Sequence, residues 1–189
     1  MKIVDADYTW NGILSKRNIT EYIVLHHRAG FGDSLSIHKD HLSKGWSGIG
    51  YHFYVRKDGT VYRGRPIATV GAHCIGYNNK SIGVCFEGNW ETDSNMPSRQ
   101  IRTGKALVTY LLKLYPKAKV LKHCDLGKTA CPGKNFPFDE IKKGEREMTV
   151  EEAVQIVQAK AGLEDETIDF LLCYKYGESL IIKLAGAME

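Results

Sequence analysis

Short apolar runs alternate with amphipathic stretches along the first three quarters of the chain. YIVLHH (22–27) and SIGVCFEG (81–88) are apolar and β-branched enough to predict buried strands. GYHFYVRKDGTVYRGR (50–65) alternates on either side of Asp58-Gly59, which predicts a β-hairpin closed by a type I′ turn. AKVLKH (118–123) is typical of one further short strand.

Helical periodicity separates these strands. The Gly-rich loop after the first strand ends at Asp33 or Ser34, and either residue can cap a helix that continues to about Lys44. Strands that alternate with helices predict an α/β fold, a mixed central β-sheet flanked by helices. The other helix is expected at 98–114, where apolar residues share one face: Ile101, Leu107, Val108, Leu111 and Leu112.

The pattern changes toward the C-terminus. Residues 142–148 (KKGEREM) are mostly charged, and Thr149 with Glu152 three positions later matches the capping box that starts a helix. Further helical segments are expected near 166–174 and 177–188. The sequence therefore predicts three parts: a domain at 1–141, a linker at 142–148 and a small helical bundle at 149–189.

Composition and charge narrow the class of protein. The 189 residues are 43% apolar and 25% charged, as in globular proteins, and no apolar run reaches the length of about 20 residues that a membrane-spanning helix needs. The first residues, MKIVDADYTWNG, lack the apolar core of a signal peptide. We therefore expect no membrane insertion and a cytoplasmic location in the producing cell.

The net charge of +4 is unevenly distributed. Residues 149–189 contain three lysines and eight acidic residues, a net charge of −5, which leaves +9 for residues 1–148. A basic main domain suits a polyanionic partner, such as nucleic acid or an anionic cell wall.

KHCDLGKTACPG (122–133) concentrates candidate chemistry in one loop, with three interpretations: a redox pair, a disulfide-stapled loop, or part of a metal site. Five cysteines without an export signal argue against disulfides. A redox pair needs a C-x-x-C spacing, but six residues separate Cys124 from Cys131. His123 and Cys131, with a histidine at the end of the first strand (His26 or His27), make a three-ligand zinc set, although this spacing alone is weak evidence.

Four blocks of sequence together carry a family resemblance that covers roughly residues 20–140. They are IVLHHRAG, GWSGIGYHFYVRKDGTVYRGRP, GAHCIGYNNKSIGVCFEGN and HCDLGKTACPG, in this order. The chain resembles the N-acetylmuramoyl-L-alanine amidase family, which includes phage amidase-lysozymes and peptidoglycan recognition proteins.

The resemblance implies the roles of the site residues. It makes His26, His123 and Cys131 the Zn²⁺ ligands, with His26 preferred to His27 because the family ligand directly follows the strand run. Strand alternation also turns the two rings to opposite faces. Zinc acidifies water and polarises carbonyl groups, as amide hydrolysis requires. Two further pairs are implied: Tyr51 and Thr129 as catalytic residues, and His73 and Asn78 as substrate-binding residues.

Other histidines and cysteines have simpler interpretations. We expect His38 and His41 to be structural or exposed, and His52 to be a core residue. Cys85 on its strand and Cys173 on an apolar helical face are expected to be packed. The side chain of Cys124, beside His123, is expected to point away from the metal.

The resulting hypothesis is a zinc-dependent amidase that cleaves the bond between N-acetylmuramic acid and L-alanine of peptidoglycan, as in a phage endolysin that acts on the wall after release. The partner is peptidoglycan rather than nucleic acid. The alternatives are a non-catalytic peptidoglycan-binding module and a cytosolic muropeptide-recycling amidase. For the C-terminal helices, wall binding and self-association stay open, and the charge of −5 counts against simple capture by an anionic polymer.

Overall fold

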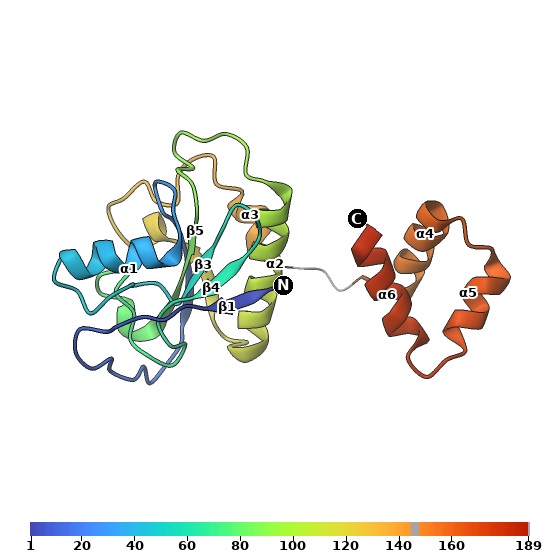
Figure 1. Cartoon of the computed structure of the whole chain (residues 1–189), viewed down its shortest axis with the longest axis horizontal. Helices are drawn as coiled ribbons and strands as arrows, with labels where there is room; N and C mark the ends of the chain where they lie inside the picture. Colours follow the sequence, from blue (N-terminus) through green and yellow to red (C-terminus); the bar gives the residue numbers. More distant parts are fainter. Residues whose placement is uncertain (145–147, 189) are drawn as a thin grey trace. The chain divides into compact units, whose positions relative to one another are not determined.

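The computed structural model describes residues 1–144 and 148–188. The chain folds into two compact units, Met1–Glu145 and Arg146–Glu189. Every strand belongs to the first unit, whereas the described part of the second is helical (Figure 1).

A mixed six-stranded sheet forms the centre of the larger unit (Figure 1). All neighbouring strands are parallel except β3 and β4, which form an antiparallel hairpin. The mixed sheet flanked by helices that the sequence predicts is therefore confirmed. In spatial order the strands are β1 (Ile3–Asp5), β4 (Val61–Arg63), β3 (Phe53–Val55), β5 (Ser81–Phe86), β2 (Tyr22–His27) and β6 (Lys119–Lys122).

Two details of the sheet differ from the sequence prediction. The hairpin exists, but its turn is not type I′: Gly59 has a φ of 83° and donates its N–H to the Arg56 carbonyl, whereas Asp58 has no positive φ. The longer connection needs only one left-handed residue, which the glycine supplies. The edge strand β1 was not predicted, because a three-residue strand has too few positions to show alternation.

Helices cover both faces of the sheet, with α1 (Ser34–Ser43) on one face and α2 (Ser98–Leu114) and α3 (Phe138–Lys142) on the other (Figure 1). Asp33 caps α1 by accepting a hydrogen bond from the Ser36 N–H, as one of the two predicted caps would. The larger core lies on the α2 side, where strand residues such as Leu25 and Phe86 pack with Leu107. A smaller cluster lies on the α1 side and includes Ile37, Tyr54 and Cys85.

The smaller unit contains α4 (Val150–Ala161), α5 (Asp165–Leu172) and α6 (Gly177–Met188). The predicted capping box of Thr149 and Glu152 is present at the start of α4. The core consists of five fully or nearly fully buried side chains: Ala153, Val157, Ile168, Ile181 and Ala185.

The prediction for Cys173 was wrong. Cys173 is exposed, because α5 ends at Leu172 and the cysteine is its C-cap, beyond the last turn that packs on the core. Leu171 and Leu172 pack against the core of this unit instead.

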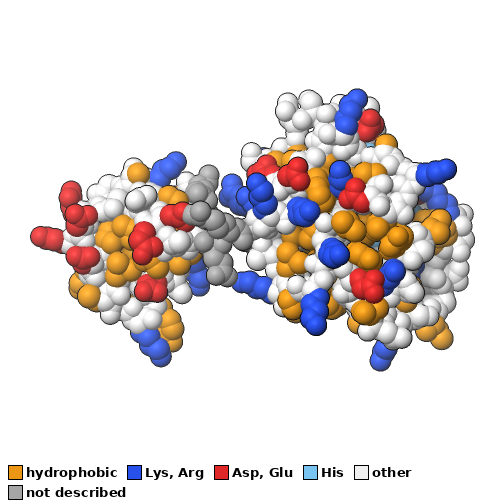
Figure 2. Space-filling model, turned by 180° about the vertical axis from the view of Figure 1, so that it is seen from behind, with side chains coloured by type: hydrophobic (Ala, Val, Ile, Leu, Met, Phe, Trp, Pro, Cys, Tyr) orange, Lys and Arg blue, Asp and Glu red, His pale blue; other side chains and the backbone are white. Residues whose placement is uncertain are grey.

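The predicted domain boundaries stay a proposal. Residues 145–147 of the predicted linker lie outside the described residues, and α3 continues to Lys142. Figure 2 shows many lysine and arginine side chains on the visible face of the larger unit and a concentration of acidic ones on the smaller unit. No helix in the described residues is long and apolar enough to cross a lipid bilayer.

Candidate metal centre and active-site cleft

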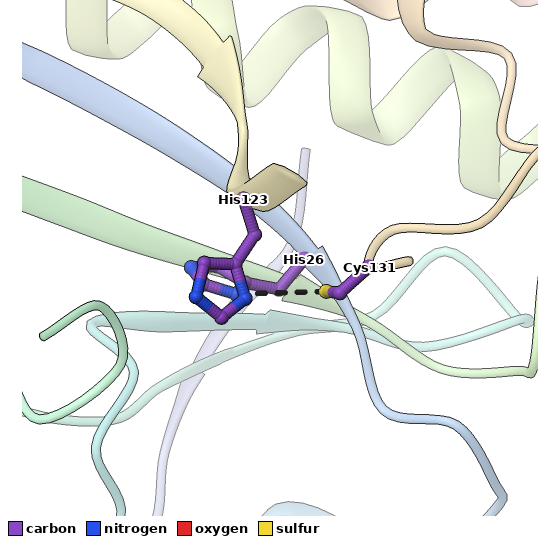
Figure 3. Close-up of side chains that lie close together, drawn as sticks. All are labelled: His26, His123 and Cys131. Atoms are coloured by element: carbon purple, nitrogen blue, oxygen red, sulfur yellow. Dashed lines mark hydrogen bonds between the residues drawn. The ribbon is translucent and has the colours of Figure 1, made fainter. Parts of the chain in front are cut away.

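The register of two parallel strands brings two histidines together. β2 pairs with β6 so that Leu25 lies opposite Lys122. His26 follows Leu25, and His123 follows Lys122. Carboxyl ends of adjacent parallel strands meet at one edge of a sheet. The two imidazole rings converge there, with their centroids 4.4 Å apart (Figure 3).

The loop after β6 returns Cys131 to the same edge. The short helix η2 (His123–Asp125) starts this loop, and the Cys124 N–H donates to the Cys131 carbonyl at 2.8 Å. The loop therefore closes on itself, and the Cys131 Sγ lies 3.7 Å from the Nδ1 of His26 (Figure 3).

The three side chains fit a zinc ion. One ligand atom from each of His26, His123 and Cys131 lies within 4.8 Å of the others. Tetrahedral zinc with Zn–N and Zn–S bonds of about 2.1 and 2.3 Å places a nitrogen and a sulfur ligand about 3.6 Å apart. The 3.7 Å between His26 Nδ1 and Cys131 Sγ agrees with that separation. Two imidazoles and a thiolate also leave the fourth position open, as in catalytic zinc sites.

Neighbouring residues of the same type lie outside the cluster. The Nδ1 of His27 accepts a hydrogen bond from the Trp90 N–H, and its backbone N–H donates to the Cys131 sulfur at 3.4 Å. Cys124 is exposed. The structure therefore places His26 and Cys131 in the cluster.

Burial controls the protonation of these groups. It lowers the pKa of His26 well below its usual value, with His123 as the next cause, and burial also lowers the pKa of His123. Both rings are therefore neutral near pH 7, the form that binds metals. Burial raises the pKa of the Cys131 thiol to about 12. Metal binding must then displace the thiol proton, so affinity will depend on pH.

Tyr51 lies beside the cluster, with its ring centroid 5.2 Å from that of His26. Burial raises the pKa of Tyr51 well above its usual value, and the nearby thiols of Cys85 and Cys131 raise it further. The phenol is therefore protonated at neutral pH and can donate a hydrogen bond.

Thr129 is exposed in the loop that carries Cys131. Its Oγ1 accepts a hydrogen bond from the Cys131 N–H at 3.1 Å, and its own N–H donates to the Gly127 carbonyl. The threonine thus shapes the loop beside the ligand.

A cavity of about 840 Å³ opens beside the cluster. His123, Thr129, His73 and Asn78 all line it, so the cavity brings together one expected ligand, one expected catalytic residue and both expected substrate-binding residues. The cavity lining also includes residues to which the sequence analysis assigned no role. Cys74, Ile75, Leu126 and Lys128 lie in the same loops as the expected site residues, whereas Trp46 and Arg65 come from other segments that meet these loops only in the fold.

The expected substrate-binding residues also make contacts within the protein. The Asn78 Oδ1 accepts hydrogen bonds from the backbone N–H groups of His73 and Cys74, both at 2.8 Å. The Nδ1 of His73 lies 3.0 Å from the Nε2 of His26. Substrate binding by His73 and Asn78 stays a prediction.

The remaining histidines are buried and bonded to the backbone. His38 and His41 accept through Nδ1 from the N–H groups of Ile49 and Gly50, at 3.1 and 2.9 Å. His52 accepts from the Gly83 N–H at 3.0 Å. These contacts agree with the structural interpretation of all three.

Residues 15–134 match the family described as N-acetylmuramoyl-L-alanine amidase (Amidase_2). The endolysin of Enterobacteria phage K11 is 38% identical over 96 residues, which cover 49% of this chain and 64% of the endolysin. The match therefore spans less than two thirds of that relative's own length.

Two further relatives align over more of their length. Peptidoglycan-recognition protein SC2 of Drosophila melanogaster is 34% identical over 143 residues, covering 68% of this chain and 76% of that protein. The solved structure of N-acetylmuramoyl-L-alanine amidase LysC from Clostridium intestinale is 43% identical, with a TM-score of 0.73, and covers 76% of this chain and 96% of that chain. None of these comparisons supports the predicted self-association.

Proposed function

This chain belongs to the N-acetylmuramoyl-L-alanine amidase family, and we propose that it hydrolyses the amide bond between N-acetylmuramic acid and L-alanine in peptidoglycan, as an endolysin. The observation that carries the proposal is the convergence of His26, His123 and Cys131, with ligand atoms within 4.8 Å, beside a large cavity. The names of the phage endolysin and of LysC support the same activity.

His26, His123 and Cys131 would hold a Zn²⁺ ion. When bound, zinc acidifies water at neutral pH and polarises a carbonyl group as a Lewis acid. Buried side chains exclude water from one side of this site, because His26 is 1% exposed and the Tyr51 ring packs against it. Exclusion of water strengthens each electrostatic interaction inside the site.

Two side chains are placed to assist hydrolysis. Tyr51 is protonated and beside His26, so its hydroxyl can donate a hydrogen bond to negative charge that develops on the carbonyl oxygen. Thr129 lines the cavity while its Oγ1 holds the Cys131 N–H, so it keeps the loop of the third ligand in place and adds a polar group beside the substrate.

The direct test is digestion of purified Gram-positive peptidoglycan by the full chain, with and without a zinc chelator. New alanine N-termini and new reducing sugar ends are quantified in the same digest. We expect new alanine N-termini that the chelator abolishes and added Zn²⁺ restores, without new reducing ends, since only the lactyl–alanine amide is cut. Reducing ends would instead indicate glycosidase activity and contradict the proposal.

Wall binding without new alanine N-termini would identify a recognition module, the alternative from a different class. A muropeptide-recycling amidase would expose alanine N-termini in soluble muropeptides but leave the intact wall uncut. Running both substrates in parallel therefore separates the three functions.

A further inference from the structure

Each ring nitrogen of His26 has its own partner. Nδ1 faces the Cys131 sulfur at 3.7 Å, on the side where the three ligand atoms converge. Nε2 faces the Nδ1 of His73 at 3.0 Å, in a contact that is buried from solvent. A neutral imidazole carries one proton, so one of these nitrogens donates and the other has a free lone pair.

Close packing positions the ring of His73 at this contact. A Cβ on Gly83 would lie 2.5 Å from the Cγ of His73, and one on Gly71 would lie 2.5 Å from its Cδ2, so the ring lies directly against the backbone at both glycines. Its far nitrogen, Nε2, is 3.4 Å from the Ser81 hydroxyl. The Asn78 Oδ1 accepts a hydrogen bond from the backbone N–H of His73.

We propose that His73 is a positioning residue for the metal centre, whose Nδ1 accepts the Nε2 proton of His26 and so directs the lone pair of His26 Nδ1 to the metal. The proposal rests on the zinc site proposed above. The proton accounting is complete, because His73 then carries its own proton on Nε2, the side that faces Ser81. The opposite arrangement puts a proton on His26 Nδ1, where it would block binding of the metal.

This role differs from the substrate contact that the family resemblance suggests for His73. A ligand histidine usually donates its second N–H to an outer partner, and loss of that partner typically costs about 10–100-fold in metal affinity. A residue that only touches substrate changes KM and leaves the affinity for metal unchanged. The two roles therefore predict different measurements.

The test compares His73→Asn with His73→Phe in the full chain. Asparagine retains an acceptor oxygen near the position of Nδ1, whereas phenylalanine fills the ring volume without an acceptor. Zn²⁺ affinity is measured by competition with a chromophoric chelator, and thermal melts of the metal-free proteins check the fold. We expect His73→Phe to lose about 10–100-fold in affinity and His73→Asn to recover most of it.

A matched control is His52→Phe. His52 is also a fully buried histidine with a backbone contact, and its ring lies 5.7 Å from that of His73, but it makes no contact with His26. We expect His52→Phe to change thermal stability but not Zn²⁺ affinity once the protein is folded. Equal losses of affinity in both phenylalanine variants would assign the effect to packing and overturn the proposal.

A spectroscopic measurement avoids substitution altogether. In ¹⁵N-histidine NMR spectra of the zinc-loaded protein, we expect His26 to be protonated at Nε2 and His73 at Nε2. A proton on His26 Nδ1, or wild-type affinity in a folded His73→Phe variant, would overturn the positioning role alone. A wild-type protein that binds no Zn²⁺ would overturn the proposed function, and this inference with it.

Discussion

At the candidate metal centre, two adjacent histidines have different surroundings, and so do two cysteines of one loop. His26 is buried among possible ligands, whereas His27 is bonded to the backbone of Trp90. Cys131 is half-buried with its sulfur near His26, whereas Cys124 in the same loop is exposed. This contrast supplies matched pairs of substitutions.

Cys131→Ser should remove zinc binding and hydrolysis, because an alcohol does not ionise to replace a thiolate ligand. The loss of affinity should exceed the roughly 10–100-fold typical of outer partners. Cys124→Ser should retain both properties. Metal content and the number of new alanine N-termini in peptidoglycan check the pair, and full activity in Cys131→Ser would refute the ligand assignment.

Tyr51→Phe should reduce kcat and keep zinc. The phenol is protonated and beside His26, and loss of one donor to developing negative charge typically costs about 10²–10³-fold in kcat. The zinc content, measured by metal analysis, should equal that of the wild type. If zinc were lost instead, Tyr51 would have a structural role at the centre.

Two histidines of helix α1 form hydrogen bonds with the backbone of the following loop. His38 and His41 accept hydrogen bonds from the backbone N–H groups of Ile49 and Gly50, just before Tyr51. The helix thus positions the chain segment that places Tyr51 beside His26, and the bonds need unprotonated Nδ1 atoms.

The stability of this contact should depend on pH. Burial, followed by the charge of Lys44, lowers the pKa of His41 from 6.5 to about 4. The unfolded chain therefore takes up the proton first, so the contribution of His41 is complete above pH 6.5 and is lost as the pH falls toward 4. Between these values it should change by about 1.4 kcal/mol per pH unit.

Denaturant unfolding of the metal-free protein at several pH values checks this slope. His41→Asn keeps an acceptor for the Gly50 N–H but cannot be protonated, so its free energy of unfolding should fall less steeply over the same interval. An identical slope in both proteins would show that His41 does not contribute to it.

The whole chain combines two units with different compositions. The larger contains the sheet, the candidate metal centre and the cavity, whereas the described residues of the smaller form a core of five buried side chains. Units of this size are marginally stable, because they bury a small share of their surface. Self-association of the smaller unit stays a prediction, which sedimentation of the full chain would test.

Ile181→Ala should unfold the smaller unit selectively. Ile181 is fully buried there, and a buried Ile→Ala change typically costs about 2–5 kcal/mol. The neighbouring Leu180 is 44% exposed, so Leu180→Ala should cost far less. Amide hydrogen exchange of both variants checks the difference, with zinc binding by the larger unit unchanged; loss of protection throughout the sheet would show that the units fold together.

Local sequence patterns by themselves determined the principal elements, and the family resemblance carried by four sequence blocks indicated the candidate ligands. Apolar runs at 22–27 and 81–88 predicted the two central strands, because burial on both faces demands such residues. The blocks around His26, His123 and Cys131 indicated the family, which the match over residues 15–134 shows. The alternation of strands and helices predicted the layers.

Only the tertiary structure decided which of these residues meet. Strand register places His26 beside His123, and loop closure adds Cys131, at separations along the chain that no local pattern encodes. The same holds for the His26–His73 contact, which joins β2 to a loop 47 residues away and packs the His73 ring against Gly71 and Gly83. The edge strand β1 also depends on a distant segment, because it forms only by pairing with β4, and local periodicity does not specify the neighbours of a strand.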